Sequence, residues 1–259
     1  MKLDQRRPRR QHRRPFEIVF EDAQLLVVDK EPGILTVPLP ERQSANIKDL
    51  LDEYLASQKR EALPVHRIDR YTSGLVVFAK NRKAWENLVA QFRARTPQRV
   101  YLALVRGLVE EDVGTLRHWL ELTTDGFRQK VARQGGTEAV THYRVLERLP
   151  GVTLLEVRLE SGLKNQIRVQ FRAFGHPLVG DRHYAPEEAS EVSLKRQALH
   201  AWKLSFLHPL TRQVLAFEAR PASDLQHLLN GLRAAAKRGA RTAGPPKGRA
   251  KRPSNSSLR

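Results

Sequence analysis

The segment HRIDRYTSGLVVFAK, residues 66–80, does most to decide the fold. A polar, charged loop runs directly into the apolar run 75–78, which predicts a buried strand that holds functional side chains in place. Asp69 lies between Arg67 and Arg70, and neighbouring cations favour the charged form of a carboxylate. Such a carboxylate is suited to a nucleophilic or electrostatic role. On local chemistry alone, a structural ion pair that closes a turn is the more common explanation.

Strand and helix patterns alternate on both sides of this segment. We expect strands over 24–29, 34–37, 75–78, 100–105, 139–146, 152–159, 199–206 and 214–219, with turns at Pro150-Gly151 and at 208–211. We expect four helices. The first has Ile47, Leu50, Leu51, Tyr54 and Leu55 on one face, and the second has Asn81 as its N-cap. The third spans 165–174 with Ile167, Phe171 and Phe174 inward, and the fourth begins at Asp224. Strands outnumber helices and most connections are short. The pattern predicts an α+β fold with a mainly antiparallel central sheet and flanking helices.

The charge of the chain is concentrated at its two ends. The formal net charge is +18, of which residues 1–15 carry +6 and residues 233–259 carry +9, whereas residues 16–232 carry only +3. Segments of this composition rarely fold and commonly bind polyanions. We therefore expect one folded domain over 16–232. It lies between a disordered basic arm, 1–15, and a disordered basic tail, 233–259, which bind nucleic acid. Charge alone does not separate RNA from DNA.

Several classes of protein are disfavoured by composition. The chain has no cysteine, so disulfide frameworks, cysteine nucleophiles and zinc ribbons are excluded. Its longest apolar runs are too short to cross a bilayer, and no apolar stretch follows the N-terminal charges as in a secretory signal. No glycine-rich nucleotide motif or metal-ligand spacing of histidines occurs. We expect a cytoplasmic, monomeric protein without cofactor, metal or membrane contact.

The segment 66–80 is one of five blocks that follow one another in a characteristic order. The blocks are Glu21-Asp22 with 25–33 (LLVVDKEPG); His66-Arg67-Ile68-Asp69 with Thr72-Ser73-Gly74; 99–103 (RVYLA); Gln166-Ile167-Arg168 with 175–181 (GHPLVGD) and Tyr184; and 199–201 (LHA) with His208-Pro209. This series resembles the RluA-type RNA pseudouridine synthases over about residues 16–220. One such motif would be weak support, whereas five in order are specific.

The resemblance implies the pseudouridine synthase fold and an isomerase that converts uridine to pseudouridine in RNA. It implies that Asp69 is the essential carboxylate, that Tyr101 lies against the uracil, and that Arg168 pairs with Asp69. The predicted RNA-binding residues are His66, Arg67, Arg70, Lys164 and Gln166. By resemblance, Arg67 occupies the space that the uridine leaves when it turns out of its stack. Because the reaction is an isomerisation, it requires neither a redox cofactor nor a metal.

Two departures from the family pattern stand out. The family usually reads Gly-Arg-Thr/Ser-His-Gln before Ile-Arg, whereas this chain has Leu163-Lys164-Asn165 between Gly162 and Gln166. RNA contacts around 163–165 are therefore expected to differ. Many members also carry an N-terminal S4 RNA-binding module, and the residues before Phe16 are too few to form one. The chain resembles the short form of the family.

Other functions are compatible with parts of the pattern. The main alternative is a non-catalytic RNA-binding or ribosome-assembly protein that has kept the fold, although Asp69, Tyr101 and Arg168 are all present. A glycosidase-like hydrolase would need a second carboxylate as acid, and no block supplies one. The sequence leaves open whether ribosomal or transfer RNA is the substrate, and whether Asp69 attacks C1′ or assists glycal formation.

Overall fold

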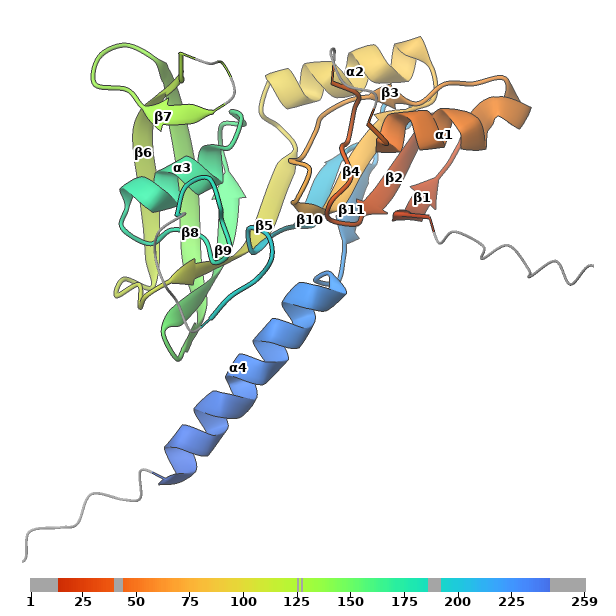
Figure 1. The fold of residues 1–259 in the computed structure, drawn as a ribbon. Helices are drawn as coiled ribbons and strands as arrows, with labels where there is room; N and C mark the ends of the chain where they lie inside the picture. Colours follow the sequence, from red (N-terminus) through yellow and green to blue (C-terminus); the bar gives the residue numbers. More distant parts are fainter. Residues whose placement is uncertain (1–13, 40–43, 125, 127, 186–191, 243–259) are drawn as a thin grey trace, which may run out of the picture.

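The structure is a computed structural model that describes residues 14–39, 44–124, 126, 128–185 and 192–242 (Figure 1). The strands are β1 (Phe16–Glu21), β2 (Leu25–Lys30), β3 (Leu63–Pro64), β4 (Ser73–Ala79), β5 (Gln98–Arg106), β6 (Val113–Leu122), β7 (Gln129–Val131), β8 (Thr137–Leu149), β9 (Val152–Leu159), β10 (Leu199–Leu207) and β11 (Val214–Glu218). The α-helices are α1 (Ile47–Leu55), α2 (Arg82–Arg93), α3 (Gln166–Ala173) and α4 (Ser223–Thr242), and a 3-10 helix spans Ala56–Gln58.

All the described strands belong to one mixed sheet. Its order is β1-β2-β4-β10-β5-β9-β8-β6-β7, with β11 paired to β10 and β3 paired to β4. Every pair among them is antiparallel except β4 with β10, which run parallel where Ser73 faces His200 and Gly74 faces Ala201. The predicted α+β fold with a mainly antiparallel sheet is confirmed.

The four helices cover both faces of the sheet. Tyr101 and Ala103 of β5 face the same hydrophobic cluster as the buried sides of α1 and α3. Leu104, which points the other way, packs with α4, while α2 packs on the strands β2 and β4 from that same opposite face. Figure 1 shows α3 against β6, β8 and β9, and α1 and α2 beside β1, β2 and β4, with β5 between the two groups.

Local signals positioned several elements correctly. The Asn81 side chain accepts a hydrogen bond from the Ala84 N–H at 2.9 Å and so caps α2 as predicted. The predicted face of α1 is confirmed, since Ile47, Leu51 and Leu55 are buried. The predicted hairpins over 139–159 and 199–219 are the pairs β8–β9 and β10–β11.

Two local predictions are wrong. Residues 34–37 form no strand: Leu35 makes a single bridge with Asn46, and the carbonyls of Leu35 and Thr36 accept hydrogen bonds from the first turn of α1. The β-rich residues here hold the start of a helix instead of extending the sheet. Phe174 does not point inward but is 37% exposed at the end of α3, where its ring contacts the ring of Tyr143.

The C-terminal helix extends further than the sequence suggested. Residues 233–242, expected to belong to the basic tail, continue α4. Three consecutive alanines from Ala234 favour a helix, and the Arg233 Nε donates to Glu147 Oε2 at 2.9 Å, which ties this turn to β8. The remainder of the predicted arm and tail, 1–13 and 243–259, lies outside the described residues. Among the described helices, none is long and apolar enough to cross a membrane.

Candidate active site

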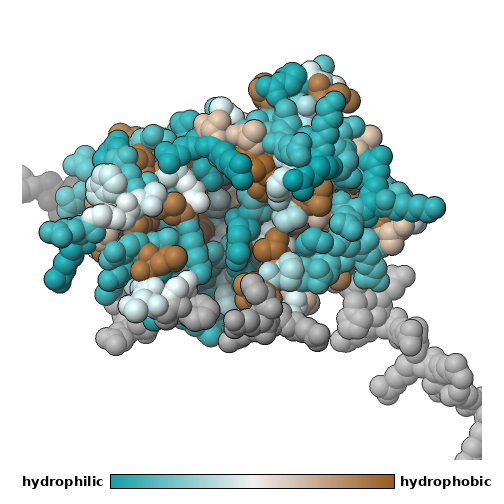
Figure 2. Space-filling model, turned by 90° about the horizontal axis from the view of Figure 1, so that it is seen from above, coloured by the Kyte–Doolittle hydropathy of each residue, from teal (hydrophilic) through white to brown (hydrophobic). Residues whose placement is uncertain are grey.

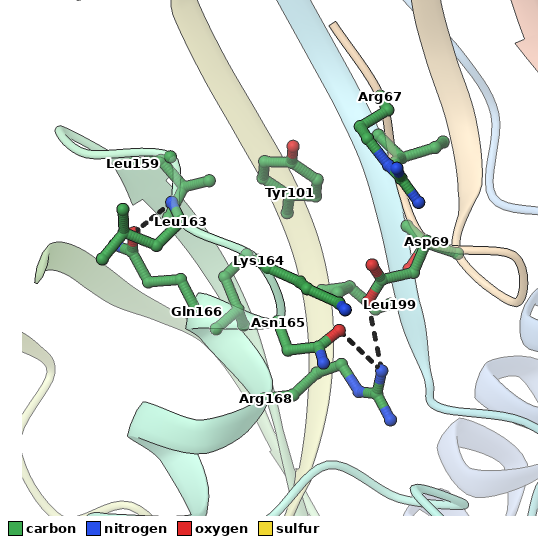
Figure 3. A pocket seen from close by; sticks show the side chains of 14 residues that line it. Arg67, Asp69, Tyr101, Leu159, Leu163, Lys164, Asn165, Gln166, Arg168 and Leu199 are labelled. Carbon is green, nitrogen blue, oxygen red and sulfur yellow. Dashed lines mark hydrogen bonds and ion pairs between the residues drawn. The ribbon is translucent and has the colours of Figure 1, made fainter. Parts of the chain in front are cut away.

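A pocket of about 240 Å³ lies between the loop before β4 and the loop before α3 (Figure 3). Its lining comes from the segments 67–72 and 162–168, together with Leu159, Tyr101 and Leu199 from three neighbouring strands. The strands β9, β5 and β10 are adjacent in the sheet, so side chains 159, 101 and 199 form a floor, and the two loops form the walls. The three residues expected to carry the chemistry, Asp69, Tyr101 and Arg168, all line this one pocket.

Asp69 and Arg168 form an ion pair across the pocket. Arg168 Nη1 donates to Asp69 Oδ2 at 3.1 Å, and the two residues are 99 positions apart in the chain. The Arg168 side chain is 7% exposed, whereas that of Asp69 is 28% exposed and open to the pocket. A charged pair in a partly dry site fixes the direction of the carboxylate.

Arg168 is anchored by a second carboxylate that sequence reasoning did not assign to the site. Its Nε and Nη2 donate to the two oxygens of Asp181 at 2.7 and 2.9 Å, and the Asp181 side chain is fully buried. Burial alone raises the pKa of Asp181, but the hydrogen bonds and charge of Arg168 outweigh it, so the pKa lies below its usual value. The only sequence signal was the position of Asp181 at the end of the block 175–181.

The departure at position 165 has a structural explanation. Asn165 precedes α3 with φ of 53°, a left-handed conformation that asparagine tolerates better than most residues. Its Oδ1 accepts a hydrogen bond from Arg168 Nη1 at 3.1 Å, and its Nδ2 donates to the Tyr184 hydroxyl at 3.4 Å. The ring of Tyr184 lies 5.1 Å from the Arg168 guanidinium carbon. Asn165 thus contributes to holding Arg168 in place.

The loop that carries Asp69 is held from beneath by buried cations. Lys30 is fully buried, and its ammonium donates to the carbonyls of Glu31, Ile34 and Arg70 at 3.0 to 3.1 Å. Burial, together with the charge of Arg196, lowers the pKa of Lys30 to about 7. Arg196 donates to the carbonyl of Tyr71, the residue after Arg70, at 3.1 Å. These contacts fix the backbone of the two residues that follow Asp69, and neither the lysine nor the arginine was predicted to do so.

Tyr101 lies on the pocket floor. Its side chain comes from the middle of β5 and the residue is 8% exposed. Burial raises the pKa of its hydroxyl, and the negative charge of Asp69 acts in the same direction. The phenol therefore remains protonated at neutral pH and presents a flat ring to the pocket.

Three of the predicted RNA-binding cations lie at the surface near the pocket. Arg67 and Lys164 line the pocket and are exposed (Figure 3). Lys164 Nζ donates to the Gly126 carbonyl at 3.3 Å. Arg70 is exposed next to Asp69 and its Nε donates to the Gly33 carbonyl at 2.7 Å. All three remain accessible to an RNA strand.

The other two predicted RNA contacts have partners inside the protein. The ring of His66 stacks on Phe92 at 4.6 Å, and its Nε2 accepts the Val77 N–H at 3.2 Å. Burial and the charge of Arg99 lower the pKa of His66 to about 3, so the ring is neutral. Gln166 is 2% exposed, and its amide bonds to Ser161, Leu163, Val140 and Thr141. Both side chains therefore have structural partners, Gln166 also lines the pocket, and a contact of either with RNA stays a prediction.

Comparison with known proteins finds relatives over most of the chain. Residues 24–173 match the family described as RNA pseudouridylate synthase. The Ribosomal large subunit pseudouridine synthase D of Nitrosomonas europaea is 39% identical over 85% of this chain and 66% of its own length. The chain belongs to the RNA pseudouridylate synthase family. The Dual-specificity RNA pseudouridine synthase RluA of Pasteurella multocida is 38% identical over 80% of this chain and 94% of its own length.

Solved structures of pseudouridylate synthases share the fold. The Human RNA Pseudouridylate Synthase Domain Containing 4 superposes with a TM-score of 0.69 at 24% identity, covering 83% of this chain and 92% of that one. These findings confirm the RluA-type resemblance, and this pseudouridine synthase is an isomerase that converts uridine to pseudouridine in RNA. Among the described residues, no group of three or more His, Asp or Glu side chains is arranged to hold a metal ion.

Proposed function

We propose that this pseudouridine synthase modifies large-subunit ribosomal RNA, with Asp69 as its essential carboxylate. The observation that carries the assignment of Asp69 is its ion pair with Arg168 at 3.1 Å, in a pocket that also contains Tyr101. The proposed substrate is supported by the names of several relatives at 36–39% identity, which are Ribosomal large subunit pseudouridine synthases D.

The reaction breaks the C1′–N1 bond of uridine, turns the uracil, and forms a C1′–C5 bond, while one proton moves from C5 to N1. Asp69 acts on the ribose, either by attack on C1′ or by removing a ribose proton to give a glycal. Arg168 orients the carboxylate. The Tyr101 ring packs against the detached uracil and its hydroxyl takes part in the transfer of the C5 proton. A pocket of about 240 Å³ is smaller than typical sites for drug-sized ligands, and it suits a single base.

The target uridine has to leave its stack to reach Asp69. The exposed side chains of Arg67 and Lys164 line the pocket, and Arg70 is exposed next to Asp69. Their charges suit the phosphates on either side of the turned-out nucleotide. In this proposal the Arg67 side chain fills the vacated position in the RNA.

The role of Asp69 is tested with Asp69→Asn, which is close to isosteric but has no carboxylate. Release of tritium from RNA labelled at C5 of uridine measures turnover. We expect a loss of at least about a thousandfold, with RNA affinity within about tenfold of wild type because binding is distributed over many phosphate contacts. Asp112→Asn, at an exposed carboxylate paired with Arg148, is the matched control and should retain full activity. Substantial turnover by Asp69→Asn would remove Asp69 from its role.

The substrate is tested by mapping pseudouridines in ribosomal and transfer RNA from cells with and without the protein. We expect at least one large-subunit ribosomal site to disappear and to return with the wild-type chain but not with Asp69→Asn. If only transfer RNA sites change, the proposed substrate is wrong while the activity stands. If no site in either class of RNA changes, the proposed substrate is likewise wrong.

A further inference from the structure

Arg99 lies close to the pocket and has no part in the site described so far. It is on β5 two residues before Tyr101, so both side chains point to the same face of the sheet. Its guanidinium carbon is 5.9 Å from the centre of the Phe92 ring. Its Nη2 donates to the carbonyl of Ser161, at the start of the pocket loop, at 3.3 Å.

The guanidinium of Arg99 is poorly satisfied by the protein. The Ser161 bond is long, and Arg99 Nε is buried without any hydrogen-bond partner. Within the part of the chain that the structure describes, no carboxylate pairs with it. By contrast, Arg168 and Arg196 are each bound by both oxygens of an aspartate. Buried polar groups of arginine are normally paired, and an arginine that is not paired calls for a ligand or a strong local reason.

A glycine opens the way from Arg99 to the pocket. A Cβ at position 162 would overlap Arg99 Nη1, so the guanidinium occupies the place of the missing side chain. Gly162 is one of the residues that line the pocket, and it lies on the same wall as Lys164. Nη1, which makes no hydrogen bond with the described residues, therefore lies directly beside Gly162, a residue of the pocket lining.

The surroundings leave the positive charge of Arg99 uncompensated. Two titratable side chains on which its charge acts carry no charge at neutral pH: His66, whose pKa burial and Arg99 lower to about 3, and Tyr101, whose pKa burial raises. The charge of Arg99 acts on the pKa of both groups, which places the guanidinium near both the loop and the pocket floor. A lone guanidinium at the edge of a site attracts an anion.

We propose that Arg99 binds a backbone phosphate of the RNA strand next to the uridine in the pocket. The proposal rests on the proposed function, because the anion is identified by the substrate: each nucleotide of RNA carries one phosphate, and a guanidinium binds phosphate oxygens through parallel N–H groups. Arg99 then has a role that is separate from Arg67, Arg70 and Lys164, since it holds the strand from the side of β5 and α2.

The test compares Arg99→Gln with Arg158→Gln. Arg158 is the matched control because it is exposed on β9 beside Val100 of β5 but on the opposite face of the sheet. The probe is large-subunit ribosomal RNA transcribed in vitro, and its binding is measured over a salt series. Loss of one phosphate contact should lower the slope of log affinity against log salt by roughly 0.7–0.9. We expect this for Arg99→Gln, with affinity about tenfold weaker, and no change of slope for Arg158→Gln.

Turnover separates binding from a structural role. At saturating enzyme, the single-turnover rate of Arg99→Gln should stay within about threefold of wild type, because Arg99 holds the strand and does not touch the reacting atoms. Arg99→Lys keeps the charge and loses the parallel N–H groups, so its salt slope should match wild type while its affinity is intermediate. An unchanged salt slope in Arg99→Gln would overturn the proposal. A saturated rate slowed well beyond threefold would also overturn it, because Arg99 would then act on the reaction itself.

A measurement on the wild-type chain covers the case in which the variants fold poorly. Phenylglyoxal modifies accessible arginines, and mass spectrometry reports each site separately. Bound RNA should protect Arg99 at least tenfold and leave Arg158 unprotected, and equal modification of Arg99 with and without RNA refutes the proposal. Neither this experiment nor the salt series requires turnover. An inactive wild-type chain would therefore count against the proposed function and not against the role of Arg99.

Discussion

Asp181→Asn is the substitution that tests most directly how the active site is held together. Asp181 has no exposed side-chain area, and both its oxygens accept hydrogen bonds from Arg168, at 2.7 and 2.9 Å. Its Oδ1 also accepts the N–H groups of His183 and Tyr184. Asparagine keeps the size of the side chain but removes the charge, and its NH₂ group faces N–H donors wherever it points.

The expected loss of folding free energy follows from the burial of the Asp181–Arg168 pair. Removing one partner of a buried ion pair destabilises a protein by about 3–5 kcal/mol, because the other charge stays buried. Arg168 keeps Asp69 as a second partner, so we expect the lower end, about 3 kcal/mol. In a domain of this size each kcal/mol shifts Tm by about 2–4 °C. Asp181→Asn should therefore lower Tm by about 6–12 °C at pH 7.

The pH dependence of this loss provides a second check. The pKa of Asp181 is lowered in the folded protein, so the pair stabilises the fold fully above the unfolded pKa of about 3.9. The stabilisation disappears as pH falls through the lower, folded value. The difference in stability between wild type and Asp181→Asn should thus be constant from pH 5 to 7 and shrink below pH 4.

Thermal and urea unfolding measure the effect, and Asp224→Asn is the control. Asp224 binds Arg196 in the same bidentate way, but its side chain is 40% exposed and Arg196 also donates to three backbone carbonyls. We expect Asp224→Asn to lower the free energy of unfolding by about 1 kcal/mol. A Tm for Asp181→Asn within 2 °C of wild type at pH 7, or a loss that persists unchanged at pH 3, would refute the reasoning.

Three further predictions concern the fold and the ends of the chain. Gly74→Ala should prevent folding, because φ is +111° and a Cβ would overlap the β10 backbone. Gly151→Ala, at an open turn, should lower the free energy of unfolding by only about 1 kcal/mol. Soluble yield and Tm measure both effects, and a well-folded Gly74→Ala would contradict the register of β4 and β10. His66 and His200 have pKa values lowered by burial to about 3 and about 4, so the unfolded chain binds more protons and stability should fall as pH drops from 6.5 toward 4; a flat urea midpoint over that range would contradict this. A chain of residues 14–242 lacks 11 of the 46 basic residues and should bind RNA with a shallower salt dependence at an unchanged saturated single-turnover rate; an unchanged slope would show that the ends do not contact RNA.

Much of the fold was readable from sequence because its signals are local. The N-cap at Asn81, the apolar face of α1 and the turn at Pro150-Gly151 each lie within a few residues of the structure they determine. The segment 34–37 failed for the same reason. Its composition is that of a strand, but its hydrogen bonds go to α1 and to the loop around Ile68, which no local pattern reveals.

The site was only partly readable because its geometry depends on distant pairs. The proposed catalytic residues Asp69, Tyr101 and Arg168 came from the family resemblance, and the structure brings them to one pocket from three separate segments. The contacts of Lys30 and Asp181 were missed because a buried charge in a sequence looks the same as an exposed one. His66 and Gln166 were assigned to RNA because they lie within matched motifs, although both side chains are used inside the protein.

The different environments of the two aspartates explain how one arginine would serve both the stability of the fold and the proposed chemistry. Asp181 is fully buried and binds Arg168 through two oxygens, so it fixes the guanidinium whether or not substrate is present. Asp69 is 28% exposed and is bound through Oδ2 alone. Its Oδ1 has no hydrogen-bond partner among the described residues and is open to the pocket. A carboxylate oriented through one oxygen, with the other free, has what attack on C1′ or removal of a ribose proton requires. Anchoring Arg168 elsewhere is what leaves that oxygen available.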